Sequence, residues 1–156
     1  MMSPANIAFA LAVMLSGQVS PATKPTRSVK VWEFLVTATR VWLPQDASNI
    51  RWVADPDRYH LVAVEVTVKN ISERVSQLRW LAPSLRVKPD AEYPEAYAPD
   101  VVKKPNLDQF LPGEESRGGY VFKVRNGTTP VALIFPAWGR GLSIDLTGML
   151  EDKSAK

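Results

Sequence analysis

The sequence predicts an all-β domain, specifically an immunoglobulin-like antiparallel β-sandwich of about seven strands. Apolar residues repeat with a period of two along most of the chain, and hardly any stretch has the spacing of an amphipathic helix. The alternating segments are short and are separated by turn signals rich in Pro, Gly, Asn and Asp. These features favour two antiparallel sheets packed face to face, with a small barrel as the alternative.

The first two predicted strands have the clearest signals. Lys30–Leu43 is rich in Val, Thr and aromatic residues, so we expect one strand there, ending at Pro44. Between Tyr59 and Asn70 the valines at 62, 64, 66 and 68 share one face, and Glu65 and Lys69 lie on the other. This alternation predicts a strand with one buried and one exposed face.

The remaining segments are shorter. Strands are expected at Ser76–Leu81 and Ser84–Val87, on either side of Pro83. Lys88–Asn106 holds four prolines and no period, and we expect a long loop or irregular edge because each proline lacks a ladder donor. Three further strands are expected at Gly118–Asn126, Val131–Phe135 and Leu142–Leu146.

The order of these motifs carries a family resemblance. A Val-x-Val-x-Asn strand end at Val66–Asn70 is followed by the turn Leu111–Glu114, a strand with Gly118 and Phe122, and the apolar strand "VALIF". From Val31 to Phe135 the chain resembles a bacterial exported domain of unknown function with a telokin-like, immunoglobulin-like sandwich, related to a small secreted mycobacterial antigen. The resemblance implies the fold and an extracytoplasmic location, and it brings no catalytic residues. Many such domains are lipoproteins, from which this chain departs because it has no cysteine.

The N-terminal residues predict export. Residues 1–22 read as a signal peptide, with an apolar run at Ile7–Leu15 and small residues before a cleavage site after Ala22. An uncleaved anchor or a buried first helix is the alternative reading. We expect a linker at 23–29, the sandwich at 30–147 and a charged tail at 148–156. The mature protein would be secreted or periplasmic in a bacterium, with no transmembrane segment.

Composition excludes several kinds of chemistry. Without cysteine the chain has no disulfide, thiol nucleophile or Cys-ligated zinc, and its one histidine, His60, rules out three-His sites. The formal net charge of +3 suggests an anionic envelope polymer or lipid headgroups as partner before nucleic acid, and a mildly basic, solvated surface is the favoured reading. We expect no cofactor and no enzyme activity. A small hydrolase using the carboxylates between Asp90 and Asp100 is the least favoured reading.

Two loops superficially resemble sites. In "FLPGEESRGGYVFKV" (Phe110–Val124), carboxylates at 114 and 115 would repel a phosphate, so we expect a turn with Pro112 second and Gly113 third, at positive φ. Gly118 and Gly119 then indicate a bulge or a close approach between segments. "DPDRYH", at residues 55–60, predicts a turn entering a strand rather than a metal loop.

The proline-rich segment is the expected partner-binding site, because long loops on sandwiches often carry binding. Its candidate contact residues are Tyr93, Glu95, Tyr97, Lys103 and Lys104. We therefore expect an exported, non-catalytic β-sandwich module that binds an envelope or extracellular protein or an anionic polymer.

A carbohydrate-binding module is the alternative function. The chain has five tryptophans, and aromatic side chains near strand ends can form platforms for sugars. The candidate sugar-contacting residues are Trp42, Trp52 and Trp138. Trp32 and Trp80 lie within strand-like runs, and we expect both in the core.

Overall fold

The computed structural model describes residues 27–44, 55–78, 81–96, 101–136 and 141–151. Within them the fold is all-β, and the paired strands of its sheet run antiparallel. The strands are β1 (Ser28–Val31), β2 (Phe34–Trp42), β3 (Tyr59–Asn70), β4 (Ser84–Lys88), β5 (Ala91–Ala96), β6 (Glu115–Arg125), β7 (Thr129–Phe135) and β8 (Leu142–Asp145). The predicted fold class is confirmed, with eight strands rather than about seven.

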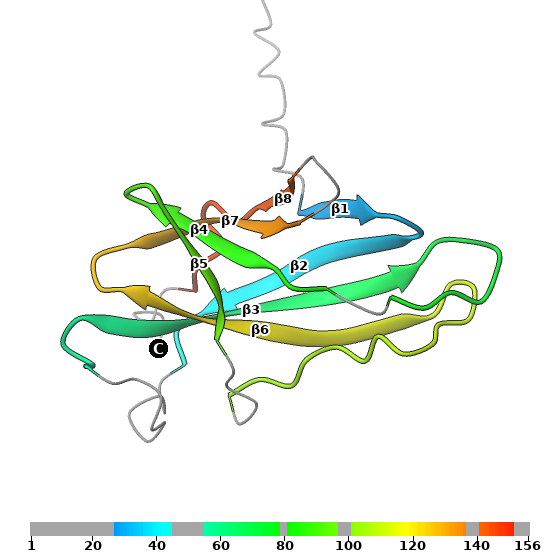
Figure 1. Ribbon diagram of the computed structural model, residues 1–156, viewed down its shortest axis with the longest axis horizontal. Coiled ribbons are helices and arrows are strands. Elements are labelled where there is room, and N and C mark those ends of the chain that lie inside the picture. Colours follow the sequence, from blue (N-terminus) through cyan, green and yellow to red (C-terminus); the bar gives the residue numbers. More distant parts are fainter. Residues whose placement is uncertain (1–26, 45–54, 79–80, 97–100, 137–140, 152–156) are drawn as a thin grey trace, which may run out of the picture.

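The strands follow the order β1-β2-β3-β6-β5-β4-β7-β8 and form two facing layers, β1-β2-β3-β6 and β4-β7-β8 (Figure 1). Strand β5 joins the layers, because it pairs with β4 up to Pro94 and with β6 at Glu95 and Ala96. On the opposite side Arg27 donates to the carbonyls of Asp145 and Thr147, at 2.7 and 2.9 Å, and so links the chain before β1 to β8 and the turn after it. The layers are therefore connected along both sides.

The core lies between the layers. The four β3 valines at 62, 64, 66 and 68 are fully buried, as the alternation predicted. Phe34 of β2 and Phe110 meet in the same core, edge to face, with ring centroids 5.1 Å apart. Burial of these apolar side chains supplies the main driving force for association of the two layers.

Three predictions about elements were wrong. The segment Lys30–Leu43 is a hairpin of β1 and β2 with a turn at Trp32 and Glu33, not one strand. The segment expected as a long loop or irregular edge contains β5, which lies between β6 and β4 in the strand order. Pro94 lies where β5 changes partner, so its missing N–H interrupts no continuous ladder. In the described part of Ser76–Leu81 there is only an isolated bridge from Ser76 to Phe110.

The glycine pair of β6 marks a close approach, one of the two predicted readings. A Cβ on Gly118 would lie 2.1 Å from the Pro105 nitrogen, and one on Gly119 would lie 2.8 Å from a Val102 methyl group. Gly119 also donates to the Lys103 carbonyl, at 2.9 Å. The chain from 102 to 105 therefore runs against β6 and covers its edge.

Paired residues extend into both the expected linker and the expected tail. The expected signal peptide, residues 1–22, lies outside the described residues, and β1 begins at Ser28, inside the expected linker. In the expected tail, Leu150 forms a bridge to Val41, and Glu151 pairs with Arg40. Residues up to Glu151 thus pack on the sandwich. In the described part of the chain, no helix is long and apolar enough to cross a membrane.

Candidate functional site

Three loops meet at one end of the sandwich, shown at the right of Figure 1. They are residues 32–33 between β1 and β2, residues 71–77 after β3, and residues 106–114 before β6; we call them together the loop end. Backbone hydrogen bonds join them: Ile71 donates to the Glu33 carbonyl at 2.9 Å, and Gly113 donates to the Asn70 carbonyl at 3.0 Å. The loop end is therefore one connected surface built from distant parts of the sequence.

Asn70, the last residue of β3, holds two of these loops together. It is fully buried, and its side-chain amide donates to the carbonyls of Arg74, Phe110 and Leu111 at 2.9 to 3.3 Å. Its side-chain oxygen accepts from the backbone N–H and the hydroxyl of Ser72, at 3.0 and 2.8 Å. A buried polar group is tolerated when it is bonded in this way, so Asn70 sets the relative position of both loops.

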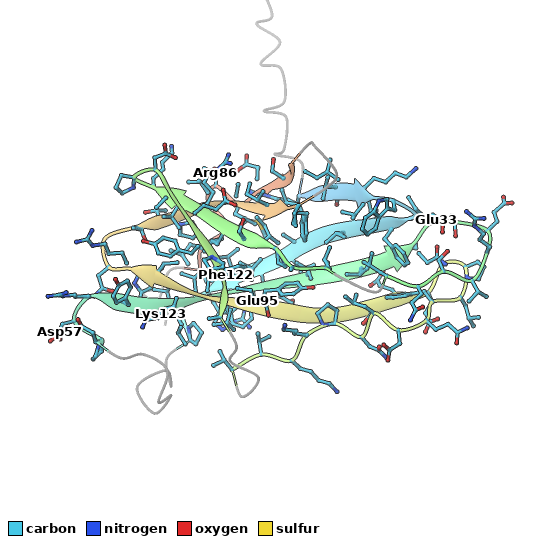
Figure 2. All side chains as sticks on the ribbon, in the orientation of Figure 1. Glu33, Asp57, Arg86, Glu95, Phe122 and Lys123 are labelled. Atoms are coloured by element: carbon cyan, nitrogen blue, oxygen red, sulfur yellow. The ribbon has the colours of Figure 1, made fainter. Side chains whose placement is uncertain are left out.

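Glu33 connects the loop at residues 32–33 to the loop at residues 71–77. Its carboxylate accepts from the Arg74 guanidinium, with the Nε–Oε1 distance at 2.9 Å, and from the hydroxyl of Ser76. The Ser76 hydroxyl and the Arg74 guanidinium hold the pKa of Glu33 below its ordinary value. This ionised network lies at the end of the molecule opposite Asp57 (Figure 2).

The loop end exposes apolar side chains. Among the described residues, the exposed large hydrophobic side chains all lie here. Their exposed fractions are 52% for Trp32, 44% for Ile71, 50% for Val75 and 59% for Leu111. The expectation that Trp32 lies in the core was wrong, because the turn at Trp32 and Glu33 projects it into solvent. Exposed apolar groups that cluster, unlike scattered ones, are typical of an interaction site.

Trp32 also has an unusual backbone conformation. Its φ is +52°, at the first central position of a two-residue hairpin turn, where glycine is the usual residue. A bulky side chain in this region costs about 1–3 kcal/mol and is often found at functional sites. The chain thus holds a strained, half-exposed tryptophan at the loop end.

A shallow hollow adjoins the exposed residues. The extended segments on either side of the Ser76–Phe110 bridge run antiparallel, which brings Val75 close to Leu111. Beside them lies an open depression of about 360 Å³. It is lined by Val75, Ser76, Gln77, Asp108 and Gln109. The surface therefore combines apolar side chains with carboxamide, hydroxyl and carboxylate groups.

The expected partner-binding residues lie elsewhere, at the junction of β5 and β6. Tyr93 packs against the core, and Glu95 lies opposite Phe122 and pairs with Lys104, with the oxygen and nitrogen 2.6 Å apart (Figure 2). Lys103 is exposed, and Tyr97 lies outside the described residues. In the structure Tyr93 contributes to packing, while Glu95 and Lys104 attach the segment covering β6.

Of the three expected sugar-contacting tryptophans, the structure describes Trp42. Trp42 is half-buried against Leu61, Ala63 and Val121, and the Arg40 guanidinium lies 4.7 Å from its ring centroid. Trp52 and Trp138 lie outside the described residues, as does Trp80, which was expected in the core. The solvent-facing tryptophan that the structure does describe is Trp32.

The two loops interpreted as turns are turns. Glu114 donates to the Leu111 carbonyl at 3.0 Å, and Gly113 has a φ of +77°, as the Pro-Gly pair predicted. At the other end, the carbonyl of Asp55 accepts from the backbone of Arg58 and Tyr59. No group of three or more potential metal ligands gathers among the residues that the structure describes.

Sequence reasoning missed the four exposed residues of the loop end. Trp32 lies within an unbroken run of strand-forming residues, with no Gly or Asn to indicate the hairpin turn. Leu111 had a usable signal, because it is apolar and adjoins the predicted turn at Pro112, whereas Val75 had none. Nothing in the sequence indicated that they would lie side by side.

Solved structures of bacterial proteins resemble this fold. The chain is similar to MPT63, a secreted protein from Mycobacterium tuberculosis, with a TM-score of 0.54 and 15% identity over 76% of this chain and 84% of that one. It shares the MPT63 fold. A conserved hypothetical protein from Bacillus anthracis is also similar, with a TM-score of 0.52 and 18% identity over 77% and 93% of the two chains. No protein-family model and no curated protein matches the sequence. The MPT63 likeness confirms the fold that the motif order implied.

Proposed function

We propose that this chain is an exported, non-catalytic β-sandwich module that binds a protein partner in the cell envelope through its loop end. The observation that carries the proposal is Trp32, strained and half-exposed among the exposed side chains of Ile71, Val75 and Leu111. Tryptophan is enriched among the residues that dominate binding energy at protein interfaces. The strain at Trp32 is explained if its indole contributes to binding.

A protein partner fits this surface better than a glycan does. Sugars stack on flat aromatic rings, whereas the neighbours of Trp32 are aliphatic side chains, which match the apolar centre of a protein interface. Two carboxylates of the loop end already have structural roles: Glu33 binds Arg74, and Glu114 accepts from the Leu111 N–H at 2.7 Å. This arrangement supports binding rather than acid–base catalysis.

Export rests on the N-terminal sequence. The apolar run at Ile7–Leu15 and the small residues before Ala22 are those of a signal peptide, and MPT63, which has this fold, is a secreted protein. Mass spectrometry of the protein from its native host tests this. An N-terminus at Thr23 is expected, and an intact Met1 would contradict export.

The variant Trp32→Gly tests the binding site. Glycine adopts positive φ without strain, so the free energy of unfolding should stay the same or rise by about 1 kcal/mol. Capture of partner from an envelope extract should nevertheless be lost. Asp57→Ala, at the opposite end, is the control and should leave capture unchanged. Equal capture by wild type and Trp32→Gly would disprove the role of the loop end.

Carbohydrate binding remains the second candidate, because Trp32 is an exposed aromatic ring. Soluble glycans that stack on it should change tryptophan fluorescence in the wild type but not in Trp32→Gly. If no glycan of a broad panel changes the signal, the sugar hypothesis fails.

A further inference from the structure

We infer that the loop end binds a cationic, apolar segment of its partner: an extended stretch in which aliphatic or aromatic residues alternate with Lys or Arg. This inference rests on the proposed function and specifies its partner. The choice of partner follows from the charge of the loop end, from the position of its carboxylates, and from the hollow beside Val75.

The loop end has the opposite charge to the rest of the chain. Its residues include four carboxylates, Glu33, Glu73, Asp108 and Glu114, and one basic group, Arg74. The formal charge of the loop end is therefore −3, whereas that of the whole chain is +3. A surface of this sign attracts cationic partners and repels anionic polymers, including the polymer expected from the chain's overall charge.

Two of the four carboxylates are placed to act on a partner. Glu33 is engaged by Arg74 and Ser76, and Glu114 stabilises its own turn. Glu73 and Asp108 are exposed and form no ion pair within the part of the chain that the structure describes. Glu73 belongs to the same loop as Ile71 and Val75, and Asp108 lines the hollow, so both carry negative charge beside the exposed apolar groups.

The hollow is large enough for a peptide side chain, and its polar lining can hydrogen-bond to a peptide backbone. A depression of about 360 Å³ has room for a large side chain. Val75 supplies an apolar wall, and the Gln109 carboxamide is a group that hydrogen-bonds to a peptide backbone. With Trp32 and Leu111 nearby, an apolar residue can enter the hollow while flanking cations face the carboxylates.

Three labelled synthetic peptides of equal length test the inference by fluorescence anisotropy. The first alternates Leu or Phe with Lys, the second has Glu in place of each Lys, and the third keeps Lys but has Ser in place of each apolar residue. We expect the first to bind at least about tenfold more tightly than either of the others, and to weaken as salt is raised. Equal affinity for the first two peptides would overturn the charge assignment, and equal affinity for the first and third would overturn the apolar one.

A charge-reversed pair of variants locates the site. Glu73→Lys combined with Asp108→Lys changes the formal charge of the loop end from −3 to +1. The cationic peptide should then bind at least about tenfold more weakly, and the Glu-containing peptide more tightly than to wild type. The matched control, Asp57→Lys with Asp90→Lys, makes the same charge change at exposed positions and should leave both affinities unchanged. Asp57 lies at the end opposite Glu33 (Figure 2), and Asp90 lies in the turn between β4 and β5, outside the loop end. An equal loss in both pairs would mean that binding follows overall charge, which contradicts the inference.

The experiments distinguish a wrong partner chemistry from a wrong binding site. If Trp32→Gly abolishes capture from the extract but the cationic peptide does not bind, the loop end is a binding site and the partner chemistry is wrong. If the peptide binds and its affinity is the same in Trp32→Gly, with unchanged capture, the proposed function is wrong. Tighter binding of inorganic polyphosphate than of the cationic peptide would favour an anionic polymer and overturn the inference.

Discussion

Gly118 of β6 lies against Pro105 so closely that a Cβ on the glycine would stand 2.1 Å from the proline nitrogen. The contact is between backbones, so no side chain can rotate away to make room. Pro105 is buried, and the segment that contains it continues into residues 106–114 of the loop end. The spacing between β6 and this segment therefore requires glycine.

Gly118→Ala should consequently destabilise the protein. The added methyl group must displace the backbone at Pro105, and we expect the free energy of unfolding to fall by about 3 kcal/mol, as for severe overpacking. Urea denaturation measures the loss. Gly141→Ala is the control: its Cβ would be 3.7 Å from Ile134, an ordinary contact, and the change should stay within about 0.5 kcal/mol. Equal stability of the two variants would show that the segment can move away from β6.

Asn70→Ala tests the residue that connects two loops of the loop end. The substitution removes the amide that donates to the carbonyls of Arg74, Phe110 and Leu111 and the oxygen that accepts from Ser72, so the free energy of unfolding should fall by about 2–3 kcal/mol. Chemical denaturation provides the measurement. The exposed Asn106 accepts one bond, from the Asp108 N–H, and Asn106→Ala should cost no more than about 1 kcal/mol. A smaller loss at Asn70 than at Asn106 would contradict its connecting role.

Acid should loosen the Glu33 network. Ser76 and Arg74 lower the folded-state pKa of Glu33 below its ordinary value of 4.5, so the folded state favours the ionised form. Its contribution to stability is complete above pH 4.5 and is lost as the pH falls through the lower folded pKa. Wild type should therefore be more stable than Glu33→Gln at neutral pH, and the difference should shrink in that acidic window. Thermal unfolding at a series of pH values measures it, and a difference that is constant with pH would refute the assignment.

Tyr120→Phe should be tolerated. The Tyr120 side chain is buried in the core, and its hydroxyl forms no hydrogen bond within the described structure. Burial and then the Glu95 charge raise the pKa of this hydroxyl, so it stays protonated and gains nothing from ionisation. Removing it should leave the free energy of unfolding unchanged or raise it by up to about 1 kcal/mol, since an unsatisfied polar group is removed. A loss above about 2 kcal/mol in thermal or urea unfolding would reveal a missing hydrogen-bond partner.

Local patterns predicted much of the fold. The valine alternation in β3 identified the core face of that strand, and the Pro112–Gly113 pair identified a turn with positive φ at the glycine. Such signals depend on a few neighbouring residues, so they can be recognised in the sequence without knowledge of the tertiary structure. The hairpin turn at Trp32 has no such signal, because the sequence there contains no Gly or Asn. Strand β5 was not predicted because it contains Pro94, a residue that is rare inside strands.

The candidate site had no comparable local signal. Asn70, Ser76 and Phe110 come together through side-chain and bridge hydrogen bonds between segments up to 40 positions apart. The expected partner-binding residues have structural roles instead. Glu95 of β5 pairs with β6 and so joins the two layers, and Lys104 forms an ion pair with Glu95 that attaches the segment covering β6. Which exposed residues share a surface depends on these long-range contacts.

The sequence by itself determined the all-β class, the identity of the main core strand and the turn at Pro112. These follow from side-chain period and local backbone preference, which need no partner strand. Only the tertiary structure decided that β5 joins the layers, that Trp32 faces solvent, and that three separate loops form one acidic, apolar end. Those outcomes depend on which segments pair, and pairing is selected by the packing of the whole chain rather than by any short stretch of it.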